Sequence, residues 1–154
     1  MVKPLHPFPN LLRQQITQHS TYWRNTLTKG AGGGSFKVNS FEDIIKEIET
    51  NVRHCEPYEH GSEASILFCI LLRLWQAADD PRKAPNNRIA LTHSSLDTLL
   101  HHQNCYVKAC GLLFVRLVLD PDGQVNVWDK WYRHHIFDEA DFMPFIEMRS
   151  KYED

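Results

Sequence analysis

The sequence has 154 residues, which is enough for one domain with a real core and short for two. Its 42% hydrophobic and 23% charged residues exclude a disordered chain, and 17 basic against 19 acidic residues create no whole-chain field that requires a polyanionic partner. The longest apolar run, "SILFCILLRLW", contains Arg73 and is shorter than the roughly 20 residues of a membrane span, so no membrane association is expected.

The first predicted helix follows a proline-rich segment at residues 1–9. Asn10 is a suitable cap, and Leu12, Ile16 and Trp23 follow it at helical spacing. Ser20 can restart this stretch as a second short helix, "TYWRNTL". The glycine-rich "KGAGGGS" at 29–35 then predicts a flexible connection, because it lacks the strand and the helix that flank a phosphate-binding loop.

The next two helices are the clearest in the chain. Ser40 opens the first one, with Asp43 at the capping-box position, and Pro57 is expected to end it. The second, "SEASILFCILLRLWQAA", is apolar on nearly every face and is therefore predicted to form the centre of the domain. The apolar stripe of the first comprises Phe41, Ile44, Ile45, Ile48, Val52 and Cys55.

A polar, proline-broken loop leads to the last predicted elements. Ser94 or Ser95 caps a short helix through Leu100, and Asn104 caps another over 104–119. "GLLFVRLVL" within that second stretch also suits a buried strand, and periodicity alone leaves the two open. Helices on both sides favour a helix. After the turn "DPDG", two further helical stretches are expected around Trp128, Trp131 and Tyr132 and around Phe142, Phe145, Ile146 and Met148.

These elements predict an all-α fold: a single compact multi-helix domain with no extended sheet. We divide the chain into a proline-rich segment at 1–9 and one helical domain at 10–154, with the glycine-rich connection at 29–35.

The histidines and cysteines do not predict a metal site. The four cysteines form no CxxC pair, which indicates reduced thiols. Cys105 and Cys110 would stand about 140° apart on one helix, and a cap at Asn104 would separate Cys105 from His101. A tetrahedral zinc site needs four convergent ligands, so we expect neither a metal nor a cofactor. We expect the histidines to lie at the C-terminal ends of helices, where a partial positive charge is favourable.

No catalytic motif supports an enzyme. The sequence has no GxSxG elbow, HExxH motif, Walker loop or kinase signature, and "DEAD" at 138–141 lacks the P-loop of a helicase. We therefore predict no catalytic residue.

Several segments, in order, resemble the pre-mRNA-splicing factor 38 family. They are "STYWRNTL", "FEDIIKEIETNVRHCEPYEHGS", "LFCILLRLW", "NCYVKACGLLFVRL" and "VWDKWYRHHIFDEADF". The second is similar to the B-type branch of the family, whose Glu-Pro-aromatic-Glu-x-Gly-Ser motif is matched by Glu56, Pro57, Tyr58, Glu59, Gly61 and Ser62. The family's glycine-rich loop after that motif is shortened here to "HGSEAS", and the resemblance implies a helix for 104–119.

The resemblance implies a non-enzymatic scaffold protein of the spliceosome, located in the nucleus. Such a protein associates with the U4/U6·U5 tri-snRNP or B complex and is required for spliceosome activation. The implied partners are extended helical B-complex proteins, a small zinc-finger splicing factor and tri-snRNP components.

Aromatic and arginine side chains on a rigid helical core can anchor such partners, because these residue types are enriched in interface hot spots. The same aromatic residues can instead pack in the core. The candidate contact residues are Tyr22, Trp23, Arg24, Glu56, Pro57, Tyr58, Trp131, Tyr132 and Arg133.

Two alternative functions stay open. Aromatic and basic residues alternate in "YWRN" and "WDKWYRHH", which suits a helical module that binds snRNA directly or contacts it peripherally. The nine histidines and four cysteines motivate the less favoured alternative, a metal- or thiol-dependent enzyme.

Overall fold

The structure is a computed structural model, and it describes residues 7–28, 38, 40–59, 61–79 and 92–118. Within these ranges the regular secondary structure is helical, and no strand forms apart from an isolated bridge between Tyr58 and Ala64. The predicted all-α fold is confirmed. The helical elements in chain order are α1 (Asn10–His19), η1 (Trp23–Thr28), α2 (Phe41–Asn51), α3 (Ile66–Asp79), α4 (His93–Leu100) and α5 (Cys105–Val118).

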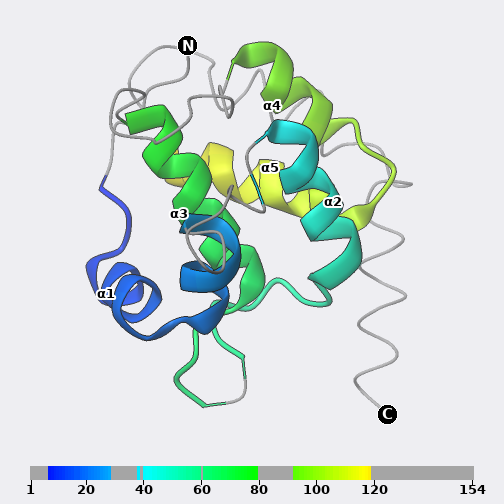
Figure 1. Ribbon diagram of the computed structural model, residues 1–154. Helices are drawn as coiled ribbons and strands as arrows, with labels where there is room; N and C mark the ends of the chain where they lie inside the picture. The colour runs from blue at the N-terminus through cyan, green and yellow to red at the C-terminus, as the bar shows by residue number, and fades with distance from the viewer. Residues whose placement is uncertain (1–6, 29–37, 39, 60, 80–91, 119–154) are drawn as a thin grey trace.

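Helix α3 is the centre of the bundle, as its all-round apolar sequence predicted (Figure 1). It contacts η1, α2 and α5, and the side chains from Leu67 to Ala78 are at most half-exposed, with most of them fully buried. Even Arg73 is only 6% exposed, and this burial lowers the pKa of its guanidinium. Ser65 caps the helix by accepting a hydrogen bond from the Phe68 amide (3.3 Å).

Helix α1 begins one residue earlier than predicted. Asn10 is its first helical residue and Pro9 precedes it, with the Pro9 carbonyl accepting from the Arg13 amide (2.9 Å). The predicted restart at Ser20 is confirmed, because its hydroxyl accepts from the Trp23 amide (3.1 Å). The chain then continues as η1, a π-helical segment, which the sequence did not suggest.

Helix α2 begins as predicted, with the Ser40 hydroxyl accepting from the Asp43 amide (3.2 Å). The prediction that it continues to Pro57 is wrong: it ends at Asn51, and Val52 is extended. The reason lies in Arg53, whose guanidinium donates to the carbonyls of Val52 (2.8 Å) and Thr50 (2.7 Å). These bonds satisfy the carbonyls that would otherwise continue the helix.

The end of α2 is held against the joint between α4 and α5. The Tyr106 hydroxyl of α5 donates to the Arg53 carbonyl (2.6 Å), and His102 Nε2 lies 3.1 Å from Glu49 Oε1. His102 Nδ1 accepts from the Asn104 amide (3.0 Å), which leaves Nε2 to carry the proton of the neutral ring toward Glu49. The three helices therefore meet at one fixed corner.

The cap of α4 differs from the prediction. Thr92 caps it, accepting from the Ser95 amide (3.1 Å), so neither Ser94 nor Ser95 is the cap. Thr and Ser cap almost equally well, and the sequence does not distinguish them.

The prediction for α5 is confirmed, including its cap. Asn104 Oδ1 accepts from the amides of Tyr106 (2.9 Å) and Val107 (3.2 Å), and the run "GLLFVRLV" is helical. Gly111 faces α4, where a side chain would meet Leu99 and Leu100. The two helices therefore approach each other closely at this residue.

Several predicted elements lie outside the described residues: the connection at 29–35, the polar loop over 80–91, and the turn and two helices after 119. Within the described part, none of the helices combines the length and the apolar character needed to cross a membrane.

Candidate partner-docking surface

The segment between α2 and α3 forms a small hairpin-like loop, which we call the 56–63 loop. Two backbone bonds close it: the Ser65 amide donates to the Pro57 carbonyl (2.9 Å), and the Glu59 amide donates to the Glu63 carbonyl (2.8 Å). Gly61 adopts a φ of 83° at its turn, a conformation that side chains rarely allow. The loop projects from the lower side of the bundle (Figure 1).

The Glu56, Pro57 and Tyr58 side chains are exposed on this loop. Tyr58 is 38% exposed, whereas its bridge partner Ala64 is buried. Leu11 on α1 is the other large apolar side chain of the described residues that is exposed to this degree or more. The loop thus presents an aromatic ring next to acidic side chains on a backbone fixed at both ends.

His54 braces the base of the loop. Its Nε2 lies 2.9 Å from Glu59 Oε2, and its Nδ1 accepts from the Glu56 amide (3.2 Å). Because Nδ1 is an acceptor, the neutral ring carries its proton on Nε2 and donates it to Glu59. His102 makes the same arrangement with Glu49, near the same C-terminal end of α2.

Tyr22, Trp23 and Arg24 do not share one face. Trp23 is 5% exposed and packs in the core, so it is not accessible to a partner. The half-buried Tyr22 donates to Glu47 Oε2 (2.7 Å), and burial together with this bond raises its pKa, so the hydroxyl stays protonated. Arg24 is exposed to solvent.

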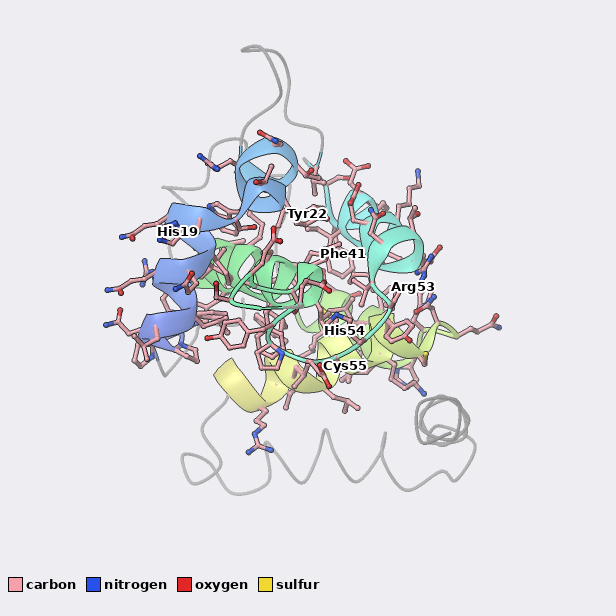
Figure 2. All side chains as sticks on the ribbon, turned by 90° about the horizontal axis from the view of Figure 1, so that it is seen from below. His19, Tyr22, Phe41, Arg53, His54 and Cys55 are labelled. Atoms are coloured by element: carbon pink, nitrogen blue, oxygen red, sulfur yellow. The ribbon has the colours of Figure 1, made fainter. Side chains whose placement is uncertain are left out.

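Figure 2 shows how these parts lie on the face seen from below. His19 lies at the edge, on α1, with Tyr22 nearer the centre, and the segment from Arg53 through His54 and Cys55 crosses the same face. Of the nine predicted contact residues, the structure brings together Glu56, Pro57 and Tyr58. Trp131, Tyr132 and Arg133 lie outside the described residues.

All four cysteines are free thiols, and burial governs their chemistry. It raises the pKa of Cys55 and of Cys69 to about 11 and that of Cys110 to about 12, and it also raises that of Cys105. Thiols with raised pKa values are protonated at neutral pH and behave as small apolar groups. Cys69 contacts the Ser20 hydroxyl (3.4 Å), which fixes α3 against the turn after α1.

The described residues contain no group of three or more His, Cys, Asp or Glu side chains placed to hold a metal ion. His101 and Cys105 belong to separate elements, because α4 ends at Leu100 and α5 begins at Cys105. His101 instead interacts with the Asp97 carbonyl of its own helix (2.9 Å).

Sequence reasoning missed several residues of this surface. His54 and Glu59 were not singled out as a pair, and Glu47, which joins Tyr22 and Asn51 (2.8 Å), was not identified. Tyr22 and Glu47 are 25 positions apart, and no local pattern connects them.

Comparison with known proteins decides the family. The model of the PRP38 family matches residues 2–142. The chain belongs to the PRP38 family. The predicted resemblance is therefore confirmed over nearly the whole sequence.

Curated relatives of this PRP38-family chain are distant and longer. Pre-mRNA splicing factor SR-like 1 of Arabidopsis thaliana is 27% identical over 112 residues, which cover 71% of this chain and 24% of that protein. Pre-mRNA-splicing factor 38B of Homo sapiens is 23% identical over 127 residues, which cover 69% of this chain and 20% of that protein. The chain thus matches about a quarter or less of these relatives' length. No solved structure matches it.

Proposed function

We propose that this chain is a non-enzymatic nuclear protein of pre-mRNA splicing, which holds other splicing proteins in place. The family match over residues 2–142 carries the proposal. The names of the relatives, SR-like 1 and 38B, are both names of pre-mRNA splicing factors. A scaffold role suits a fold whose described side chains form a continuous apolar core.

Within splicing, we place its action at spliceosome activation, in association with the U4/U6·U5 tri-snRNP or B complex. Its partners would be extended helical B-complex proteins, a small zinc-finger splicing factor and tri-snRNP components. The state of the thiols supports a role without catalysis, because raised pKa values make them poor nucleophiles.

The 56–63 loop is the contact that we propose for a protein partner. Tyr58 supplies an aromatic anchor, and aromatic residues are enriched among interface hot spots. Glu56 and Glu63 are exposed on either side of it, so the matching partner segment would carry apolar and basic side chains. Because both loop ends are hydrogen-bonded, little backbone ordering opposes binding.

The test is capture of the tagged full chain from nuclear extract, with identification of bound proteins by mass spectrometry. We expect tri-snRNP proteins in stoichiometric amounts with the unmodified chain, and a clear loss with Tyr58→Ala. Leu11→Ala is the matched control, because it removes an apolar side chain of α1 that is even more exposed (77% against 38% for Tyr58) and should leave capture unchanged.

Absence of spliceosomal proteins from the unmodified capture would overturn the proposed function. Equal capture by Tyr58→Ala would overturn only the assignment of the loop.

A further inference from the structure

The charges of the chain are segregated along its sequence. The first 41 residues contain no Asp or Glu and five basic residues, namely Lys3, Arg13, Arg24, Lys29 and Lys37. Even spacing of the 19 acids over 154 residues would place about five acids there (41 × 19/154). The rest of the chain carries 12 basic and 19 acidic residues, so a charge of +5 is followed by one of −7.

The described part of this basic segment forms α1 and η1, which contact each other. Leu12, Ile16 and Trp23 point into the core, and α1 lies at the edge of the bundle, away from α4 (Figure 1). We use the name α1 face for the exposed side chains of residues 10–25, which come from α1, the turn after it and the start of η1. Its exposed polar side chains are Asn10, Arg13, Gln14, Thr17, Gln18, His19, Thr21, Arg24 and Asn25.

Both arginines of the α1 face can bind an anion. Among the described residues neither one forms an ion pair. Arg13 is also held in place, because its Cζ lies 5.4 Å from the centre of the Trp75 ring, which in turn packs edge-on against Phe8. A guanidinium stacked on a ring keeps its N–H groups directed sideways, so it loses less freedom when it binds.

The composition of the α1 face distinguishes between two classes of anionic partner. An acidic protein segment would need apolar anchors as well as charge, and the α1 face has no exposed aromatic residue and one exposed large apolar side chain, Leu11. Phosphate groups instead accept hydrogen bonds from Arg, Asn, Gln and Thr, which are the residues present.

We propose that the α1 face binds a nucleic-acid strand through its phosphodiester backbone, with Arg13 and Arg24 as phosphate contacts. This goes beyond the protein-docking role of the 56–63 loop and does not depend on it. Acidic residues on α2 and the loop, among them Glu42, Glu49 and Glu56, repel phosphates and thereby confine the strand to α1.

The test is fluorescence anisotropy of a labelled 20-nucleotide single strand with the full chain, over a range of salt concentrations, using RNA and DNA of the same sequence. For Arg13→Gln with Arg24→Gln we expect about tenfold weaker binding. The slope of log K against log salt should fall by about 1.4, which is 0.7 for each of two single-strand phosphate contacts.

Two further variants separate this binding from general effects. Lys46→Gln on α2 removes one exposed positive charge among acids and should leave the affinity within about twofold. Gln14→Glu with Gln18→Glu places carboxylates on the α1 face without touching the core, and should weaken binding even if loss of the Arg13–Trp75 stacking perturbs the arginine variant.

Tighter binding of RNA or of DNA would support the proposal and identify the natural strand. Three results would overturn it: no binding of either strand, an unchanged affinity in both α1 variants, or an equal loss with Lys46→Gln. Tighter binding of polyglutamate than of either strand at matched charge concentration would also overturn it, in favour of an acidic protein partner.

Discussion

Replacement of Gly111 by alanine should have two opposing effects on the stability of the fold, each of known size. An alanine Cβ at this position would lie 3.0 Å from Leu99 Cβ and 3.1 Å from Leu100 Cδ2. Helix propensity favours the change by about 1 kcal/mol, because glycine is a poor residue inside a helix such as α5. Overpacking of a close helix contact opposes it by about 1–3 kcal/mol.

The identity of the contacted atoms decides the sign. Leu100 Cδ2 ends a side chain that can rotate, but Leu99 Cβ is attached to the backbone of α4 and moves only with the helix. Helix α4 is fixed at its C-terminal end by the corner where His102 meets Glu49. We therefore expect Gly111→Ala to lower the free energy of unfolding by about 1 kcal/mol.

The assay is urea unfolding of the full chain followed by far-ultraviolet circular dichroism. The midpoint should fall with the denaturant slope unchanged, since a changed slope would mean altered compactness. Leu100→Ala removes two of the three atoms nearest to the added Cβ. In that background, Gly111→Ala should therefore lower the free energy of unfolding by less than it does in the unmodified chain. A midpoint for Gly111→Ala equal to or above that of the unmodified chain would refute the reasoning.

Three further predictions concern stability. Burial raises the pKa of the Cys110 thiol from 9.0 to about 12, so the stability that the protonated thiol contributes is fully present below pH 9 and is lost as the pH rises, by about 1 kcal/mol between pH 9 and 10. In Cys110→Ala the free energy of unfolding should therefore fall by about 1 kcal/mol less over that interval than in the unmodified chain, and parallel pH profiles of the two proteins would contradict this prediction. Tyr106→Phe removes the hydroxyl that donates to the Arg53 carbonyl and should cost about 1 kcal/mol in urea titration; an unchanged midpoint would mean that water replaces this bond fully. Gly61→Ala should lower the melting temperature because its φ of 83° strains a side chain although no atom lies within 4 Å, whereas Gly61→Asn should lower it less; equal losses would point to a cause other than backbone strain.

Helix positions could be predicted from the sequence where a local pattern decides them. The caps at Ser20, Ser40 and Asn104 were correct because each hydroxyl or amide acts on an amide two or three residues away. The end of α2 was wrong because the apolar spacing continues to Cys55 after the helix has stopped. The residue that ends it, Arg53, is held by Tyr106, which lies 53 positions further along the chain.

The candidate surface was predictable only in part. The exposed Glu-Pro-Tyr motif came from the family resemblance, and the structure adds that Tyr58 is bridged to Ala64. Helical spacing correctly raised core packing as the alternative for Trp23, and the core is where this residue lies. Neither the brace from His54 to Glu59 nor the bond from Tyr22 to Glu47 follows from spacing, since both depend on how separate segments meet.

The segregation of charge changes what the net charge of −2 means. A net charge near zero gives no steering of the whole chain toward polyanions. This value is, however, the sum of an acid-free first quarter and an acidic remainder. Because salt screens electrostatic interactions beyond about 10 Å, a partner responds to the charges of the surface that it meets and not to the net charge. A basic partner segment at the 56–63 loop and a nucleic-acid strand at the α1 face would therefore occupy different surfaces. Raised salt would weaken both, whereas Tyr58→Ala should affect only the first and Gln14→Glu with Gln18→Glu only the second. Loss of both activities from either change would mean that the two surfaces are one site.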